Sequence, residues 1–154
     1  GVNTMIPNLI VYDAISNNDI DRLTGYTTVR REVKFGDSRF DIYCENENEK
    51  CFVEVKNVTM KVGNAALFPD AVTTRGRKHL ETLIEVKKQG MRAIMLYVIQ
   101  RMDVETFGPS EDIDPEYAKS LRKAIKYGVE VIAVQAKVSP EGIEIVEEED
   151  PNNL

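Results

Sequence analysis

Two chain reversals between residues 27 and 58 constrain the fold of this chain more than any other feature. Three consecutive segments are rich in β-branched and aromatic residues, which is typical of strands: 27–35, 38–44 and 51–58. Gly36 and Asp37 predict a two-residue turn between the first two segments, and the polar stretch 45–50 predicts a longer hairpin loop before the third. The sequence therefore predicts an antiparallel meander of three strands.

The length of the first turn fixes which residues of the meander face one another. Counting outward from that turn places Glu32 opposite Asp41. If Cys44 and Cys51 close the second hairpin, the same counting places Asp41 opposite Glu54. Three carboxylates are therefore expected in a row across three adjacent strands.

The two-residue period of a strand divides these side chains between two faces. Four basic residues are expected on or near the face of the three acids: Arg30, Lys34, Arg39 and Lys56. The other face is expected to be an apolar layer, made of Val29, Val33, Phe40, Ile42, Cys44, Cys51, Val53 and Val55. Like charges directly opposite one another destabilise a sheet, so the acidic row requires a compensating cation.

Hard oxygen ligands such as these carboxylates suit Mg²⁺, Mn²⁺ or Ca²⁺. Lys56 follows Glu54 by two residues and could polarise an attacking water or stabilise a pentavalent phosphate. This pattern is that of a phosphodiesterase site. The alternative is that the neighbouring Arg and Lys residues neutralise the acids in a solvent-facing polar network without a metal.

The rest of the chain alternates helical and strand patterns. Helices are predicted at 6–15, from Asp70 as the N-cap to about residue 89, and at 115–127. Strands are predicted at 92–100 and 129–138, with a short edge strand at 142–146, and loops at 60–68 and 109–115. The order α-β-β-β-α-β-α-β predicts an α/β fold with a mixed central sheet flanked by helices.

The charge distribution bears on the kind of partner. The formal net charge of −6 by itself argues against nucleic acid. However, residues 139–154 contain six Asp and Glu residues and no Lys or Arg, so the C-terminal end accounts for the whole excess. Segment 73–92 holds six basic and two acidic residues, which indicates either a basic patch or an ordinary solvated helix face.

The sequence also limits the compartment. It has no apolar run long enough to cross a bilayer, and no signal or transit peptide is visible, so no membrane association and a cytoplasmic location are expected. Cys44 and Cys51 are too few for a disulfide framework. They are expected to be free buried thiols, with a structural disulfide as the alternative.

Several of these motifs resemble known families. Asp41, followed after a hairpin by Glu54-Val55-Lys56, is similar to the signature of the PD-(D/E)XK nucleases. Longer stretches in the same order resemble the sugar fermentation stimulation protein A family: 1–4, 31–33, 38–41, 51–59, 68–80 and 114–118. The resemblance implies a restriction-endonuclease-like core, with Asp41, Glu54 and the Val55 carbonyl as ligands of Mg²⁺ or Mn²⁺. It also implies Lys56 as the catalytic lysine and Glu32 as an accessory acid.

The same resemblance implies a DNA-binding protein linked to sugar metabolism, particularly that of maltose. It further implies an N-terminal domain of the oligonucleotide-binding type, for which this sequence has no counterpart. Residues 1–146 are therefore expected to form the nuclease-like domain, and 147–154 an acidic tail. A homodimer is an expectation by analogy with nucleases that cut two strands.

Five further residues are candidates for DNA contact or an accessory role: Ser38, Arg39, Arg75, Lys78 and His79. His79 is the only histidine, and on the predicted helix it lies four residues after Arg75, near the side that can approach the metal. Ordinary surface or packing roles are the alternative for both residues. For Asp70, helix capping is the favoured interpretation and a functional role is the alternative.

Three functions follow from these observations. The first is a metal-dependent DNA nuclease, and the second is a non-catalytic DNA-binding regulator of sugar metabolism genes. The third is an enzyme acting on a sugar phosphate. The sequence offers no Gly-rich phosphate loop and no nucleophile in support of the third.

Overall fold

The computed structural model describes residues 5–140 and 142–149 of the 154-residue chain. Its helical elements are α1 (Met5–Ser16), the 3-10 turn η1 (Asp21–Leu23), α2 (Thr74–Lys88) and α3 (Pro115–Lys126). Its strands are β1 (Thr28–Phe35), β2 (Ser38–Glu45), β3 (Lys50–Val58), β4 (Met60–Val62), β5 (Ala65–Phe68), β6 (Arg92–Ile99), β7 (Thr106–Pro109), β8 (Glu130–Ser139) and β9 (Gly142–Glu149). The described helices include none long and apolar enough to cross a lipid bilayer.

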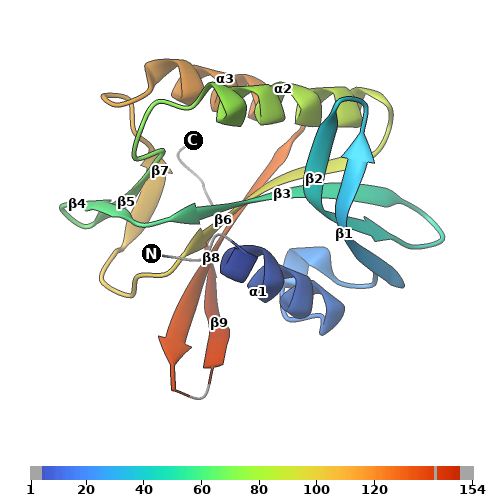
Figure 1. Ribbon diagram of the computed structural model, residues 1–154, viewed down its shortest axis with the longest axis horizontal. Coiled ribbons are helices and arrows are strands. Elements are labelled where there is room, and N and C mark those ends of the chain that lie inside the picture. Colours follow the sequence, from blue (N-terminus) through green and yellow to red (C-terminus); the bar gives the residue numbers. More distant parts are fainter. Residues whose placement is uncertain (1–4, 141, 150–154) are drawn as a thin grey trace.

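Six strands form a central mixed sheet in the order β1-β2-β3-β6-β8-β9. The pairs β3/β6 and β6/β8 are parallel, and the other neighbours in this sheet are antiparallel. Helices α2 and α3 lie side by side over one face, and α1 lies against the other (Figure 1). Because helices cover both faces of β6, its sequence is an almost continuous apolar run. The predicted fold class, a mixed central sheet flanked by helices, is confirmed.

Each face of the central sheet has its own apolar core. Phe52 and Tyr97 pack with Leu83 of α2 on one face. On the opposite face, Val53 and Leu96 pack in a second core that includes residues of α1. Alternate residues of β3 and β6 thus enter different cores, which holds the middle of the sheet rigidly between the helices.

A second, smaller sheet consists of β4 and β5, which lie within the predicted loop 60–68, and β7, which ends at the start of the predicted loop 109–115. Its order is β4-β5-β7, with β4 and β5 antiparallel and β5 and β7 parallel. These strands are only three or four residues long, and β5 pairs with a partner almost forty residues further along the chain. Such short strands carry too little periodicity to be recognised from the sequence.

The first hairpin has the predicted register but not the predicted faces. Pairing follows the expected count on both sides of Glu32, whose φ of 55° lies in the left-handed region. Beyond that residue the ribbon turns over, so Val33 and Phe40 pack in the core under α2 and α3, whereas Ile42 packs in the core of α1. The expectation of one continuous apolar face is therefore wrong at the hairpin tip.

The starts of α2 and α3 are joined by hydrogen bonds. Thr73 caps α2 by accepting from the Gly76 N–H at 2.9 Å, so the prediction of Asp70 as the cap is wrong. Asp114 caps α3 by accepting from the Tyr117 N–H at 3.0 Å, and it also accepts from the Thr73 N–H at 2.9 Å. Burial raises the pKa of Asp114, but these two backbone donors, together with the charges of Arg77 and Lys56, outweigh it and leave the pKa lowered.

The C-terminal edge strand is longer than predicted. β9 runs to Glu149, and its backbone pairs with β8 through the first three residues of the expected acidic tail. Residues 150–154 of that tail lie outside the described residues. The strand paired with β8 therefore extends beyond the predicted boundary at 146.

The two cysteines are free, as predicted. Cys44 and Cys51 are cross-strand partners of β2 and β3, and both are buried in the core on the α1 side. Their position in an apolar layer indicates a packing role.

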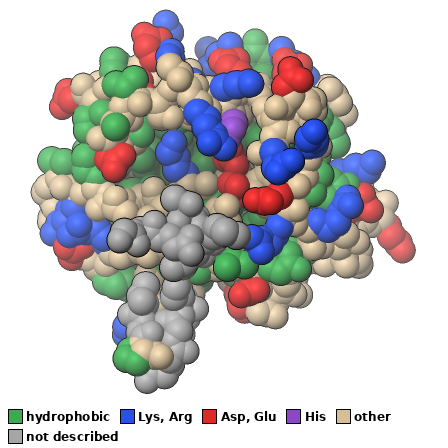
Figure 2. Space-filling view, viewed as in Figure 1, with side chains coloured by type: hydrophobic (Ala, Val, Ile, Leu, Met, Phe, Trp, Pro, Cys, Tyr) green, Lys and Arg blue, Asp and Glu red, His purple; other side chains and the backbone are tan. Residues whose placement is uncertain are grey.

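The basic segment predicted at 73–92 forms much of α2. Its Lys and Arg side chains at Arg75, Lys78, Lys87 and Lys88 are exposed. In Figure 2, Lys and Arg side chains lie on several sides of the single histidine, and acidic side chains lie directly beneath it. The positive charge of this face is thus gathered around a small acidic centre.

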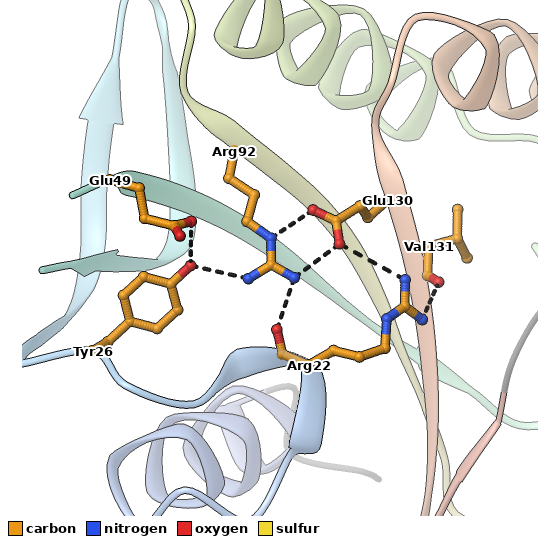
Figure 3. Close-up of polar contacts among 6 residues, drawn as sticks. All are labelled: Arg22, Tyr26, Glu49, Arg92, Glu130 and Val131. Carbon is orange, nitrogen blue, oxygen red and sulfur yellow. Dashed lines mark hydrogen bonds and ion pairs between the residues drawn. The ribbon is translucent and has the colours of Figure 1, made fainter.

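Arg92 at the start of β6 connects the segment after α1 to the sheet (Figure 3). Its guanidinium donates to both carboxylate oxygens of Glu130, at 2.5 and 2.8 Å, and to the Tyr26 hydroxyl at 3.0 Å. It also donates to the Arg22 carbonyl at 2.7 Å, and Arg22 itself donates to the Val131 carbonyl at 3.2 Å. Bidentate geometry and partial burial make this the strongest polar link described between that segment and the sheet.

The variant Arg92→Met is expected to lower the free energy of unfolding by about 2–3 kcal/mol, because it leaves a half-buried Glu130 carboxylate without its partner. Urea denaturation measures this loss. Arg122→Met is the matched control, because the Arg122–Glu111 pair lies at the exposed surface and is expected to contribute less than about 1 kcal/mol. Equal losses in the two variants would contradict the structural role of Arg92.

Candidate active site

A pocket of about 600 Å³ lies along the end of β3. Pairing between β2 and β3 extends only as far as Ile42 and Val53, whereas β3 pairs with β6 on to Val58. The pocket is lined by β3 from Glu54 to Asn57, with residues of α1 to one side and of α2 and α3 to the other. It also collects eight of the ten residues predicted for the site: Glu32, Arg39, Asp41, Glu54, Val55, Lys56, Arg75 and His79.

Asp41, which is half-buried, and the buried Glu54 form a carboxyl pair that lines this pocket. One oxygen of Asp41 accepts from the Val55 N–H at 2.8 Å, and the other accepts from the side-chain amide of Asn8 in α1 at 3.0 Å. Glu54 is only 6% exposed and contacts Nδ1 of His79. The two acids expected to face one another across β2 and β3 are therefore brought together.

Both acids of this pair have raised pKa values. Burial, together with the hydrogen bond and the negative charge of Glu54, raises the pKa of Asp41 to about 8. Burial also raises the pKa of Glu54. At neutral pH the two carboxyls hold a proton between them, which is the behaviour of two acids placed close together without a cation.

The backbone of β3 adds a third oxygen to this pair. In an extended strand, the N–H and C=O of one residue point toward the same neighbouring strand. The Val55 N–H points to Asp41. The Val55 carbonyl is therefore on the side of β3 that faces Asp41.

Glu32 lies apart from the pair. Its side chain is exposed at the rim of the pocket, on the residue where the β1 ribbon turns over. Within residues 5–140 and 142–149, no three His, Cys, Asp or Glu side chains form a group that could hold a metal by themselves. Of the three carboxylates predicted to form a row, Asp41 and Glu54 therefore lie together, and Glu32 forms no metal-binding group with them.

Lys56 lies half-buried in the pocket beside the acids. Its Nζ lies 5.1 Å from the ring centroid of Tyr117, and in the part of the chain that is described it forms no hydrogen bond or ion pair. Burial lowers its pKa, and the charge of Glu54 offsets part of that effect. Its ammonium hydrogens therefore remain available for a phosphate.

The alternative of a neutralised polar network requires four basic side chains to pair with the acids. Across the described residues, Arg30, Lys34, Arg39 and Lys56 form no ion pair with Glu32, Asp41 or Glu54, and Arg30 instead lies over the ring of Tyr43. The polar contacts seen at the carboxyl pair come from Asn8, His79 and the backbone. The structure thus gives this alternative no support.

His79, Arg75 and Arg39 surround the entrance. Burial lowers the pKa of His79, and the nearby charge of Arg75 lowers it further, so the imidazole is neutral at pH 7. Arg75 and Arg39 are exposed on opposite sides of the pocket, one on α2 and the other on β2. Two guanidinium groups at the mouth of an acidic pocket suit a ligand with several phosphates.

Two of the predicted accessory residues lie outside the pocket. Ser38 is buried, and its hydroxyl lies 3.1 Å from that of Thr82, which ties the hairpin tip to α2. Lys78 is exposed on α2 but does not line the pocket. A DNA contact by Lys78 stays a prediction, whereas the position of Ser38 favours a structural role.

Sequence reasoning missed two residues of the site, Asn8 and Tyr117. Asn8 is the polar residue after Pro7 in an otherwise apolar helix start, which is the signal that could have singled it out. Tyr117 lies in the stretch 114–118 that carries part of the family resemblance. Neither pattern predicts contact with β2 or β3, because that contact depends on how the helices dock.

Comparison with known proteins agrees with this fold. The family model described as "Sugar fermentation stimulation protein RE domain" matches residues 5–142. A sugar fermentation stimulation protein homolog of Geotalea uraniireducens is 51% identical over 146 residues, which is 94% of this chain and 63% of that protein. A homolog of Geobacter metallireducens is 47% identical, over 96% of this chain and 64% of that protein.

A solved structure is also similar. The structure of Pyrococcus furiosus SfsA in complex with Ca²⁺ matches with a TM-score of 0.89 and 28% identity, over 97% of this chain and 65% of that one. The chain thus spans slightly less than two thirds of the length of these relatives. On the family match and the sequence identity together, this chain belongs to the sugar fermentation stimulation protein family.

Proposed function

We propose that this chain is a DNA-binding phosphodiesterase domain that depends on Mg²⁺ or Mn²⁺. One observation carries the proposal: the half-buried Asp41 and the buried Glu54 share a pocket with Lys56, a cation that forms no ion pair in the described residues. Buried groups of this kind are costly to fold and are retained where they act on a ligand. The activity of the longer relatives' whole chains is part of the same proposal.

The donor set fits a hard divalent cation. Asp41 and Glu54 supply two carboxylates and Val55 supplies a carbonyl, which leaves further coordination positions for water and phosphate oxygens. Burial and the nearby Glu54 raise the pKa of Asp41, so a dication bound between the two carboxylates would offset their mutual repulsion. The Pyrococcus furiosus SfsA structure is a complex with Ca²⁺, which supports divalent metal binding in this family. When bound, such a metal supplies charge stabilisation and an activated water.

The side chains around the pair have distinct tasks in this proposal. Lys56 donates to a non-bridging oxygen of the scissile phosphate and stabilises the charge that develops there. Arg39 and Arg75 bind neighbouring phosphates of the strand at the two sides of the entrance. Asn8 and the Val55 N–H fix the orientation of Asp41.

Cleavage of labelled single- and double-stranded DNA tests the proposed reaction. Cleavage is expected with Mn²⁺ or Mg²⁺ and not with EDTA, on the strand form that fits the pocket. Salt-dependent DNA binding without cleavage under any divalent ion would instead favour the non-catalytic regulator. Absence of both binding and cleavage would contradict the proposed function.

Metal affinity is expected to depend on pH. The metal requires ionised carboxylates, and the pKa of Asp41 in the metal-free protein is about 8, so protons compete with the metal below that value. Apparent Mn²⁺ affinity should therefore rise about tenfold per pH unit from 6 to 8 and then level off. Calorimetry in buffers of different ionisation enthalpy measures the released protons. An affinity that is constant over this range would contradict a shared proton on the carboxyl pair.

A further inference from the structure

We propose that Tyr117 is the positioning residue of Lys56: its ring face holds the ammonium in place of an acidic partner and leaves the ammonium hydrogens free for the scissile phosphate. The inference rests on the proposed function for its catalytic consequence, but its structural claim is independent of any cleavage. Two sets of contacts and one chemical argument support it.

The first is the position of the ammonium itself. Lys56 Nζ lies 5.1 Å from the centroid of the Tyr117 ring, within the range of a cation–π contact. On the other side it borders the first turn of α2, where a Cβ added to Gly76 would lie 3.0 Å from Nζ. The ammonium therefore lies between a ring and a helix turn that has no side chain at this point.

The second is the rigidity of the ring. Tyr117 is only 1% exposed, and its hydroxyl lies 2.5 Å from that of the fully buried Tyr97. Phe68 stacks on Tyr97 with ring centroids 3.9 Å apart and meets Tyr117 edge-on at 6.3 Å. Contacts from α3, β5 and β6 thus fix the ring, and Asp114 fixes the backbone of Tyr117 at the start of α3.

The third is the consequence for catalysis. A lysine held by a carboxylate must break that ion pair before it can bind a phosphate, whereas the ring is neutral and takes none of its N–H bonds. The flexible four-carbon stem of lysine would otherwise sample several rotamers in a pocket of this size. The ring thus holds the Lys56 ammonium in position without neutralising its charge.

The same chain offers a matched reference. Lys88 lies over the ring of Tyr127 at 5.2 Å, at the far end of α2, and both residues are exposed. Lysine-selective ¹³C labelling of the metal-free protein reports both pairs, because protons above a ring face are shifted upfield. The Lys56 Hε signal is assigned by its loss in Lys56→Arg. It is expected upfield of the signals of lysines that contact no ring.

Two substitutions separate the ring from the hydroxyl. Tyr117→Phe keeps the ring and should keep the upfield shift. Tyr117→Leu should move the Lys56 signal to the position of lysines that contact no ring, and the Lys88 signal should not change. Absence of the shift in the parent protein, or its persistence in a folded Tyr117→Leu variant, would overturn the proposal. The parent measurement decides the matter even if the Leu variant does not fold.

Kinetics then test the catalytic part. In Mn²⁺, Tyr117→Leu is expected to lower kcat for DNA cleavage about tenfold with little change in KM, and Tyr117→Phe to stay within about threefold of the parent. Mn²⁺ affinity should be equal in all three proteins. Equal kcat values for the parent and the Leu variant would overturn the catalytic part. A parent that shows the upfield shift but never cleaves DNA would refute the proposed function and leave the positioning role of Tyr117 intact.

Discussion

Replacing Asp41 with asparagine is expected to abolish metal binding and, at the same time, to stabilise the metal-free protein at alkaline pH. Asparagine keeps an acceptor for the Val55 N–H and its amide can donate to Glu54 in place of the shared proton, although it gives up the acceptor for the Asn8 amide. It removes one anionic ligand, so the Mn²⁺ affinity should fall by at least about a hundredfold. Calorimetric titration with Mn²⁺ measures this loss.

The stabilisation follows from the sign of the pKa shift. The pKa of Asp41 is about 8 in the folded protein, above the value of about 3.9 expected in the unfolded chain, so the folded state binds the proton more tightly. Metal-free parent protein therefore loses stability as the pH rises from about 4 through 8, and the variant does not. At pH 8 the metal-free variant should therefore be more stable than the metal-free parent by several kcal/mol.

Denaturation at pH 5 and pH 8, with and without Mn²⁺, provides the test. Mn²⁺ should raise the Tm of the parent and leave that of Asp41→Asn unchanged. Asp37→Asn, at the exposed turn of the same hairpin, is the matched control and should respond to Mn²⁺ like the parent. A variant at position 41 that Mn²⁺ stabilises as strongly as the parent would show that this carboxylate is not a ligand.

The variant Lys56→Met is expected to lower DNA cleavage by about 10²–10³-fold while metal affinity stays at or slightly above that of the parent. Methionine replaces the aliphatic stem of Lys56 beside Tyr117 but removes the half-buried cation near the acid pair. Because the lost interaction is with the developing charge on the phosphate, the effect should lie in kcat rather than in KM. Single-turnover cleavage with saturating Mn²⁺ measures it.

Lys88→Met is the control for this variant. Lys88 also lies over a tyrosine ring, but at the exposed end of α2 and away from the pocket, so its loss should leave cleavage unchanged. If Lys56→Met cleaves as fast as the parent, the lysine has no part in the reaction. A fall in Mn²⁺ affinity in Lys56→Met would instead assign it to the metal site.

Local pattern is enough to predict most of the sheet and its register. The turn at Gly36-Asp37 and the cross-strand pair Cys44–Cys51 fix the pairing of β1, β2 and β3 as counted from the sequence. Turn length sets register before any tertiary contact forms. For the same reason the sequence predicts Asp41 and Glu54 as neighbours, and they lie together in the structure.

Features that depend on tertiary contact are not predictable in this way. The turn of the ribbon at Glu32 requires a left-handed backbone conformation that a glutamate adopts only when packing compensates for it. The strands β4, β5 and β7 gain stability from pairing across almost forty residues. The contacts of Asn8 with Asp41 and of Tyr117 with Lys56 arise only when α1 and α3 dock on opposite sides of β3.

The expectations about assembly and domain organisation stand as predictions. A homodimer and a separate oligonucleotide-binding domain in the longer relatives involve partners or segments other than the described residues, and of the expected tail 147–154 only 147–149 are described, as part of β9. The site at β3 does not depend on them, since its acids, its lysine and its aromatic support all come from residues 5–140. The metal binding proposed for the carboxyl pair can therefore be tested on this chain alone.

Isothermal titration of the chain with Mn²⁺ at pH 8 is the decisive test of the proposed metal site, because the carboxyl pair is more fully ionised there than at neutral pH. Saturable Mn²⁺ binding below millimolar concentration is expected at pH 8, and binding at pH 7 is expected to release protons. If the folded protein binds no Mn²⁺ up to millimolar concentration, the proposal that Asp41 and Glu54 form a divalent-metal site is contradicted.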